Sequence, residues 1–275
     1  MSPLREIALV VERELVRNLR SAKGLVLAGI CVLGGVGTTL VTLSAQGRIG
    51  SKFGAESVHS MREEAIAQVY GKEIGKALAG MPEVLFVLMS GTLALAALLA
   101  VFVGFDTVAG DLQHRAVRYW TVRTRRSSYF VGKYLGMFAV ASTMTLLMNV
   151  VCWIVILAKS SVPVSDVVVW GFRLWLVTLP VSAAWCALVA FFSGLFRTPI
   201  LALLTSAFAW LVLLVTYGIG RASDNDTITW VHPSGFDRLL LSPSPDKFGL
   251  GLLASGLFAA LFLGAALLLF QQRDA

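Results

Sequence analysis

Few residues in this chain could carry enzymatic chemistry, and those few are far apart in the sequence. The three histidines fall in three different polar segments, at His59, His114 and His232, and no HExxH motif accompanies them. Gly-Lys pairs occur, but none continues to the Ser or Thr that ends an ATP-binding phosphate loop. An intramembrane serine protease would need a histidine base inside an apolar segment, and each histidine lies outside them. We therefore expect no catalytic residue, no metal site and no bound cofactor in this chain.

The charged side chains instead gather in two segments, of which the first covers residues 4–22. Apolar residues recur there at helical spacing and predict an amphipathic helix. Such a helix lies in the membrane interface, with its apolar face toward the acyl chains and its basic face toward lipid phosphates. The charged residues are candidates for contacting lipid or a partner protein, and the glutamates favour the partner: Glu12, Arg13, Glu14, Arg17 and Arg20.

The second charged segment covers residues 106–131, between two long apolar stretches. Asp106 lies at the edge of the first stretch, where an acid needs a partner or water. Asp111 is expected to begin a short helix, because a carboxylate is stabilised at the positive N-terminal end of a helix. The candidate functional residues in and beside this segment are Asp106, Asp111, Arg115, Arg118, Trp120, Arg123, Arg125, Arg126 and Lys133.

The rest of the chain is strongly apolar: of its 275 residues, 57% are hydrophobic and only 14% are charged. Soluble domains are typically about 45–50% apolar and about 25% charged, so lipid is the expected solvent. Six charge-free stretches reach the length of about 20 residues that crosses a bilayer as a helix, and a helix satisfies its own backbone groups in lipid. The sequence predicts one all-α transmembrane domain over residues 1–275, with spans at about 24–45, 84–105, 132–158, 173–195, 198–219 and 248–271.

Lys and Arg are densest in residues 1–23 and 106–133, and positive charge near span ends marks the cytoplasmic side. We therefore expect both termini and the loop 106–131 to be cytoplasmic, in the inner (cytoplasmic) membrane of a bacterium. Loops 46–82 and 220–247 then lie outside, where the longer could be a solvated spacer or a platform for an extracytoplasmic partner. The net charge of +7 is divided among separate segments, which argues against a nucleic-acid partner.

The loop 106–131 also carries a family resemblance. The series Asp106…Gly110-Asp111, a short amphipathic stretch, and then Arg126-x-x-Tyr129-x-x-Gly132-Lys133 resembles the cytoplasmic loop of ABC-2 type permeases, the membrane subunits of a class of ATP-binding cassette (ABC) exporters. The amphipathic N-terminal helix, the six spans and a polar loop before the last span extend the resemblance to the whole chain. The layout is also similar to the permease of nitrous-oxide-reductase maturation systems. Two departures are Ala116-Val117-Arg118, where the family has a Gly-Thr-Leu-like stretch, and Arg123, where it usually has proline.

This resemblance implies a fold, partners and a mechanism. The fold would be that of ABC-2, or type V, exporters, with residues 111–126 forming a coupling helix that seats in a cleft of a separate ATPase. Two ATPase copies would bind ATP and Mg²⁺, and a second permease, forming a homodimer, would complete the membrane portion among the lipids. Two alternatives stay open: a non-transporting scaffold that transmits mechanical work, and a channel or secondary carrier. The last is disfavoured because the interiors of the spans show few polar residues and none of the buried charges typical of ion-coupled carriers.

Overall fold

The structure is a computed structural model that describes residues 2–53, 63–64, 66–68, 70–78, 80–223 and 225–272. The side chains of residues 49–53, 118, 121–123 and 226 lie outside this description, as does the stretch 54–62 of the predicted outer loop. Throughout the described ranges the regular secondary structure is helical, with no strand.

Six helices in the described ranges are long and apolar enough to cross a membrane. They are α2 (Ala22–Phe53), α5 (Glu83–Gly104), α8 (Arg126–Lys159), α9 (Val164–Leu195), α10 (Pro199–Ala222) and α13 (Pro245–Gln272). The shorter helices are α1 (Pro3–Arg20), α4 (Lys72–Leu78), α6 (Ala109–Gln113), α7 (Ala116–Arg123), α11 (Asp226–Thr229), the 3-10 turn η1 (Pro233–Phe236) and α12 (Asp237–Leu240). The prediction of an all-α protein with six candidate membrane-spanning helices is confirmed.

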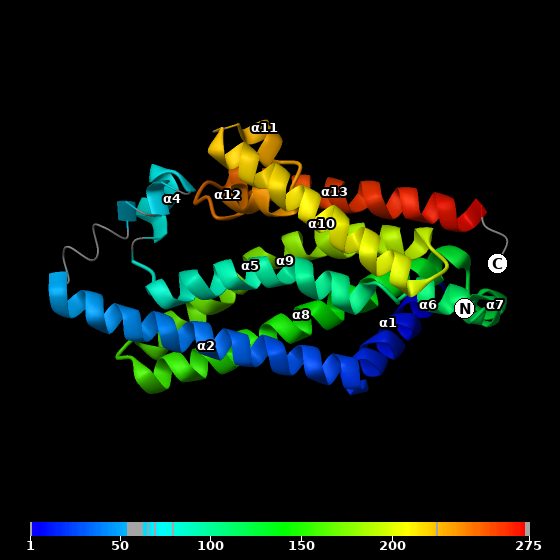
Figure 1. Cartoon of the computed structure of the whole chain (residues 1–275), viewed down its shortest axis with the longest axis horizontal. Coiled ribbons are helices and arrows are strands. Elements are labelled where there is room, and N and C mark those ends of the chain that lie inside the picture. The colour runs from blue at the N-terminus through cyan, green and yellow to red at the C-terminus, as the bar shows by residue number, and fades with distance from the viewer. Residues whose placement is uncertain are drawn as a thin grey trace.

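The long helices form an elongated bundle (Figure 1). The start of α1 and the end of α13 lie at the same end as α6 and α7, whereas α4 lies toward the other end. A break at Ser21, whose backbone is extended, separates α1 from α2, and α1 leaves the line of α2 at an angle there (Figure 1). The N-terminal and 106–131 segments, distant in sequence, therefore meet.

Helix α9 lies at the centre of the bundle and contacts α5, α8, α10 and α13. Its Val181, Trp185 and Cys186 side chains are fully buried. Helices α2 and α10 are peripheral and turn leucine, isoleucine and valine side chains outward. An apolar surface of this extent is expected to contact lipid or another protein.

Two glycines on α8 let α1 approach closely. A Cβ atom added at Gly132 would lie 2.6 Å from Cβ of Val10, and one at Gly136 would lie 2.6 Å from Cβ of Glu14. Residues four apart share one face of a helix, so Gly132 and Gly136 form a flat strip of the small-xxx-small type that packs membrane helices. This packing brings the polar stripe of α1 against α8.

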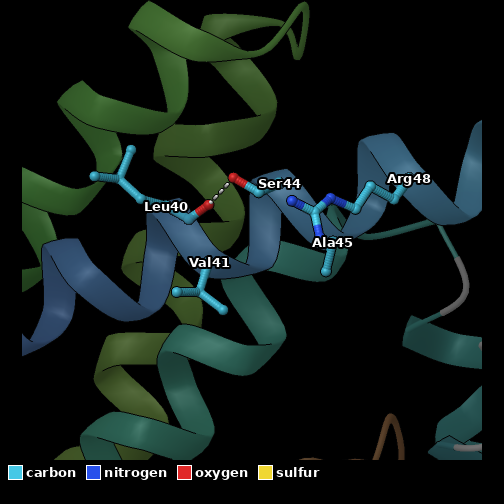
Figure 2. Close-up of a pocket in the computed structure, with 5 residues that line it drawn as sticks. All are labelled: Leu40, Val41, Ser44, Ala45 and Arg48. Carbon is cyan, nitrogen blue, oxygen red and sulfur yellow. Dashed lines mark hydrogen bonds between the residues drawn. The ribbon is translucent and has the colours of Figure 1, made fainter.

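The outward face of α2 carries a shallow groove of about 480 Å³ near the end of the bundle opposite α1 (Figure 2). Leu40, Val41 and Ala45 line it, with Arg48 at one end. The hydroxyl of Ser44 donates to the carbonyl of Leu40 at 2.8 Å. Because that hydroxyl is already bonded within the helix, the groove is mainly an aliphatic surface beside one guanidinium group.

Candidate functional site

Lys133, near the start of α8, is the centre of a buried ion network. Its side chain is 2% exposed, and its Nζ lies 2.7 Å from Oε1 of Glu14 on α1 and 2.5 Å from Oδ2 of Asp111 on α6. Arg17 closes the network from the half-exposed side, with Nη2 2.7 Å from Oε2 of Glu14 and Nη1 3.8 Å from Oδ1 of Asp111. Two acids and two bases from three helices thus form a neutral cluster, which we call the ionic clamp.

Hydrogen bonds orient the carboxylates of the ionic clamp. The hydroxyl of Tyr129, one turn before Lys133 on α8, donates to Oδ2 of Asp111 at 2.6 Å. The Nδ2 of Asn18 donates to Oε2 of Glu14 at 3.5 Å and to the backbone carbonyl of Glu14 at 3.0 Å. Breaking a buried ion pair by removing one partner costs about 3–5 kcal/mol. The clamp should therefore hold α1, α6 and α8 in one arrangement.

Ser193 of α9 fixes the turn that carries Asp111 to the clamp. Its Oγ accepts from the backbone N–H groups of Val108 and Ala109 at 3.0 and 3.1 Å, and it donates to the carbonyl of Phe105 at 3.0 Å. The chain turns sharply after α5, and α6 begins at Ala109. Asp111 lies within the first turn of α6, rather than beginning the helix as the sequence predicted.

Helix α7 is a separate element that follows a left-handed residue. Arg115 has φ 54°, which ends α6 and redirects the chain, so the predicted segment 111–126 is two short helices rather than one. Trp120 of α7 is half-buried, and the guanidinium of Arg13 lies 4.4 Å from its ring centre. Tyr119, 80% exposed, and Arg115 face away from the protein. One face of α7 is thus anchored and another is free to contact a partner.

Aromatic stacking extends this anchorage to α13. The rings of Trp120 and Tyr129 lie 6.2 Å apart, and Tyr129 stacks on Phe270 at 5.9 Å with an interplanar angle of 19°. Arg126 also donates from Nη1 to the carbonyl of Gln271 at 3.2 Å. The first turn of α8 therefore joins α7, the ionic clamp and the last turn of α13.

Two further contacts tie the N-terminal segment to the loop. Lys23 lies 2.8 Å from Oδ1 of Asp106 and so provides the partner that an acid at the membrane edge was expected to need. The carboxylate of Glu6 accepts a 3.1 Å hydrogen bond from the backbone N–H of Arg125, which lowers the pKa of Glu6. Glu6 thereby caps the start of α8.

The structure corrects the predicted role of α1. Glu14 is 2% exposed and pairs with Lys133 of the same chain, so its partner is internal rather than the lipid or second protein proposed from the sequence. The buried stripe of α1 is Glu6, Val10, Glu14 and Asn18, whereas Leu4 is 78% exposed. The face that packs on the protein is therefore this mixed polar stripe, and the apolar face at Leu4 stays exposed, as a face toward the acyl chains would be.

Some predicted site residues take no part in the clamp. Glu12 and Arg20 are exposed on α1, as Arg125 is before α8. The side chains of Arg118 and Arg123 lie outside the described residues. Four further residues of this region were not predicted from the sequence: Glu6, Asn18, Lys23 and, as a partner of Asp111, Tyr129. For Glu6 and Asn18 the available signal was their spacing of eight and four residues from Glu14, which places all three on one face of α1.

Comparison with protein-family models and with characterised proteins finds no match to this chain. Among the described residues no group of three or more His, Cys, Asp or Glu side chains could hold a metal ion. The clamp pairs each carboxylate with a cation and leaves neither positioned as a nucleophile or base. The arrangement joins α6 directly, and α7 through Trp120, to α1 and α8.

Proposed function

We propose that this chain is the transmembrane permease subunit of an ABC transporter of the exporter type. A separate ATPase subunit would hydrolyse ATP, and this chain would couple that work to substrate movement across the membrane. The observation that carries the proposal is the exposed face of α7, joined on its other side to the ionic clamp. A partner that moves α7 acts through Trp120 and Asp111 on the base of α8.

The dimensions of α8 suit this role. It has 34 residues, which at 1.5 Å per residue gives about 51 Å, more than the hydrocarbon core of a bilayer. Lys133 lies near its start, within two turns of Arg126. Because separating Lys133 from its acids would leave a buried charge unpaired, a displacement of α6 should move α8 rather than break the clamp.

The assembly proposed with this function follows the family resemblance. Two copies of the chain, with the ABC-2 type fold, would pair with two ATPase subunits that hold ATP and Mg²⁺, in the inner membrane of a bacterium. The chain termini and α6–α7 would face the cytoplasm, and the start of α1, the end of α13 and α6–α7 lie at one end of the bundle, which supports this arrangement (Figure 1). The same clamp could serve a complex that transmits force without transport.

Co-purification from the native host tests the proposal. Arg115→Asp reverses an exposed charge at a left-handed position that aspartate tolerates, and Tyr119→Ala removes the most exposed aromatic of α7. We expect the two changes together to reduce recovery of a nucleotide-binding subunit at least tenfold. Lys159→Glu, an exposed charge reversal at the other end of α8, is the matched control and should leave recovery unchanged.

Isolation of the unaltered chain with no ATPase partner would refute the proposal. If the partner is found, reconstitution in liposomes separates transport from force transmission. Hydrolysis of ATP that is stimulated by a transported compound supports a transporter, whereas hydrolysis stimulated only by a protein partner supports the scaffold.

A further inference from the structure

A second polar centre lies between α5 and α10, beneath the loop that carries η1 and α12. It is a cavity of about 230 Å³, here named the α5–α10 cavity. One water needs only about 10–15 Å³ of such volume, so there is room for a larger molecule. Aliphatic and aromatic side chains form its walls, and two buried polar side chains reach it: Leu93, Ala97, Trp210, Tyr217, His232 and Asp237.

His232 lines this cavity and carries a hydrogen-bond donor that has no partner in the described part of the chain. The side chain is 5% exposed, and its Nδ1 accepts a 3.1 Å hydrogen bond from the backbone N–H of Ser234. Burial lowers the pKa of His232 to about 4, so the ring is neutral at physiological pH and carries its proton on Nε2. Among the described residues this Nε2 has no hydrogen-bond partner.

Asp237 presents an acceptor to the same cavity. The side chain is 3% exposed, and its Oδ1 has no hydrogen-bond partner in the described part of the chain. The charge of Asp237 is attracted by the guanidinium of Arg221 and its carboxyl is hydrogen-bonded by Tyr70. The carboxylate therefore needs no second cation, but one of its oxygens can still accept a hydrogen bond.

The ring of His232 is held in place by its neighbours. It lies 5.1 Å from the Trp185 ring in an edge-on arrangement and 4.8 Å from the Tyr217 ring. A donor fixed in this way, with an acceptor lining the same small volume, is a built site rather than a surface feature. Convergent polar groups in an apolar pocket are the usual form of a small-molecule site.

The acceptor of Asp237 and the donor of His232 together favour some classes of ligand over others. A hydroxyl both donates and accepts, so it matches an acceptor without a partner, Oδ1 of Asp237, and a donor without a partner, Nε2 of His232. An ammonium group only donates, so it would give the N–H of His232 no acceptor. It would also be repelled by the guanidinium of Arg221. A carboxylate or phosphate only accepts, and it is repelled by Asp237.

We propose that the α5–α10 cavity binds the hydroxyl head of a neutral aliphatic alcohol, with Asp237 accepting from it, His232 donating to it and the chain lying along α5 and α10. This inference concerns ligand binding alone and does not depend on the transport function proposed above.

Photoaffinity labelling of the full chain in phospholipid nanodiscs tests the site. The probe is a medium-chain alcohol that carries a diazirine, and mass spectrometry maps the labelled residues. Labelling should fall on α5, α10 and the 230–237 segment, and 1-octanol should compete at least tenfold more strongly than methyl octyl ether, which has no hydroxyl donor. Equal competition by the two would mean partition into an apolar gap and would overturn the proposal.

Two substitutions test the assigned acceptor. Asp237→Leu removes it and should weaken labelling at least tenfold, whereas Asp237→Asn keeps an oxygen acceptor and should retain labelling. Stronger competition by octylammonium than by 1-octanol, or loss of labelling in Asp237→Asn, would indicate a cation site instead. If Asp237→Leu folds poorly, the competition by 1-octanol and methyl octyl ether on the unaltered chain still tests the proposal.

Discussion

At the scale of single residues, Lys133 shows why the ionic clamp is stable as a group. An ammonium group that is 2% exposed loses its hydration, and only the two carboxylates within 2.7 Å compensate for that loss. Each carboxylate in turn has Arg17 as a second cation. The stabilising free energy therefore comes from the cluster as a whole, and the removal of one side chain weakens the interactions of the other three.

Lys133→Met tests this dependence. The change leaves Glu14 and Asp111 with the half-exposed Arg17 alone, so we expect the free energy of unfolding to fall by about 3–5 kcal/mol. Lys159→Met, at the exposed end of the same helix, should change it by less than about 0.5 kcal/mol. Thermal unfolding in detergent measures both variants, and equal melting temperatures would contradict a clamp role. The double variant Lys133→Met with Glu14→Met should recover part of the loss.

His232 and Asp237 should give opposite pH dependence of stability. Burial lowers the pKa of His232 from 6.5 to about 4, so the unfolded chain binds more protons between these values and stability rises with pH. Burial raises the pKa of Asp237 from 3.8 to about 6, so the folded chain binds more protons there and stability falls as pH rises.

The two slopes oppose each other in the unaltered chain, and single substitutions should separate them. Asp237→Asn leaves only the His232 slope, so its melting temperature should rise from pH 4 to 6.5. His232→Gln leaves only the Asp237 slope, so its melting temperature should fall from pH 4 to 6. Thermal melts across this pH range measure the effect, with Arg221 and Arg238 charged throughout. If the melting temperatures of the two variants changed with pH in the same direction, burial would not be what shifts the pKa values of His232 and Asp237.

At the scale of helices, the hydropathy pattern predicted which segments are helical but not which face of α1 packs. A leucine that faces lipid and one that faces a neighbouring helix look alike in sequence, so the buried stripe of Glu6, Val10, Glu14 and Asn18 could not be identified from hydropathy. Contacts between helices could not be predicted either, because nothing in the spacing of Glu14 and Lys133 shows that they meet.

Helix α9 begins at Val164 rather than at residue 173. Arg173 lies 5.2 Å from the Trp170 ring and does not end the helix, because a long side chain can carry its charge away from the apolar surface.

The close contact of α1 with α8 can be tested at Gly132. Gly132→Ala places a methyl group against Val10, so we expect a loss of about 1–3 kcal/mol in the free energy of unfolding. Gly256→Ala on α13 meets no atom within 4 Å and should instead stabilise its helix by up to about 1 kcal/mol. Thermal unfolding of the two variants compares them directly. A stabilised Gly132→Ala would show that α1 does not pack on this strip.

At the scale of the whole molecule, the two ends of the bundle have different chemistry. One end has the ionic clamp and the exposed face of α7, and toward the other lies the α5–α10 cavity, with its neutral histidine and single acid. Helix α5 reaches both, because its cavity residues and the turn to α6 are about two helical turns apart. A ligand in the cavity could therefore influence the clamp through α5, and α9 packs against that helix along its length.

The orientation of this bundle in the membrane is the last prediction. The density of Lys and Arg predicts that α7 is cytoplasmic and that the turn between α8 and α9 is outside. In intact cells an impermeant maleimide should therefore label Ser161→Cys, an exposed and nearly isosteric change in that turn, and should label Tyr119→Cys only after the cells are opened. Cys31, Cys152 and Cys186 are at most 3% exposed, so the unaltered chain provides a low background. Labelling of Tyr119→Cys in intact cells would invert the topology, and an ATPase could then no longer reach α7.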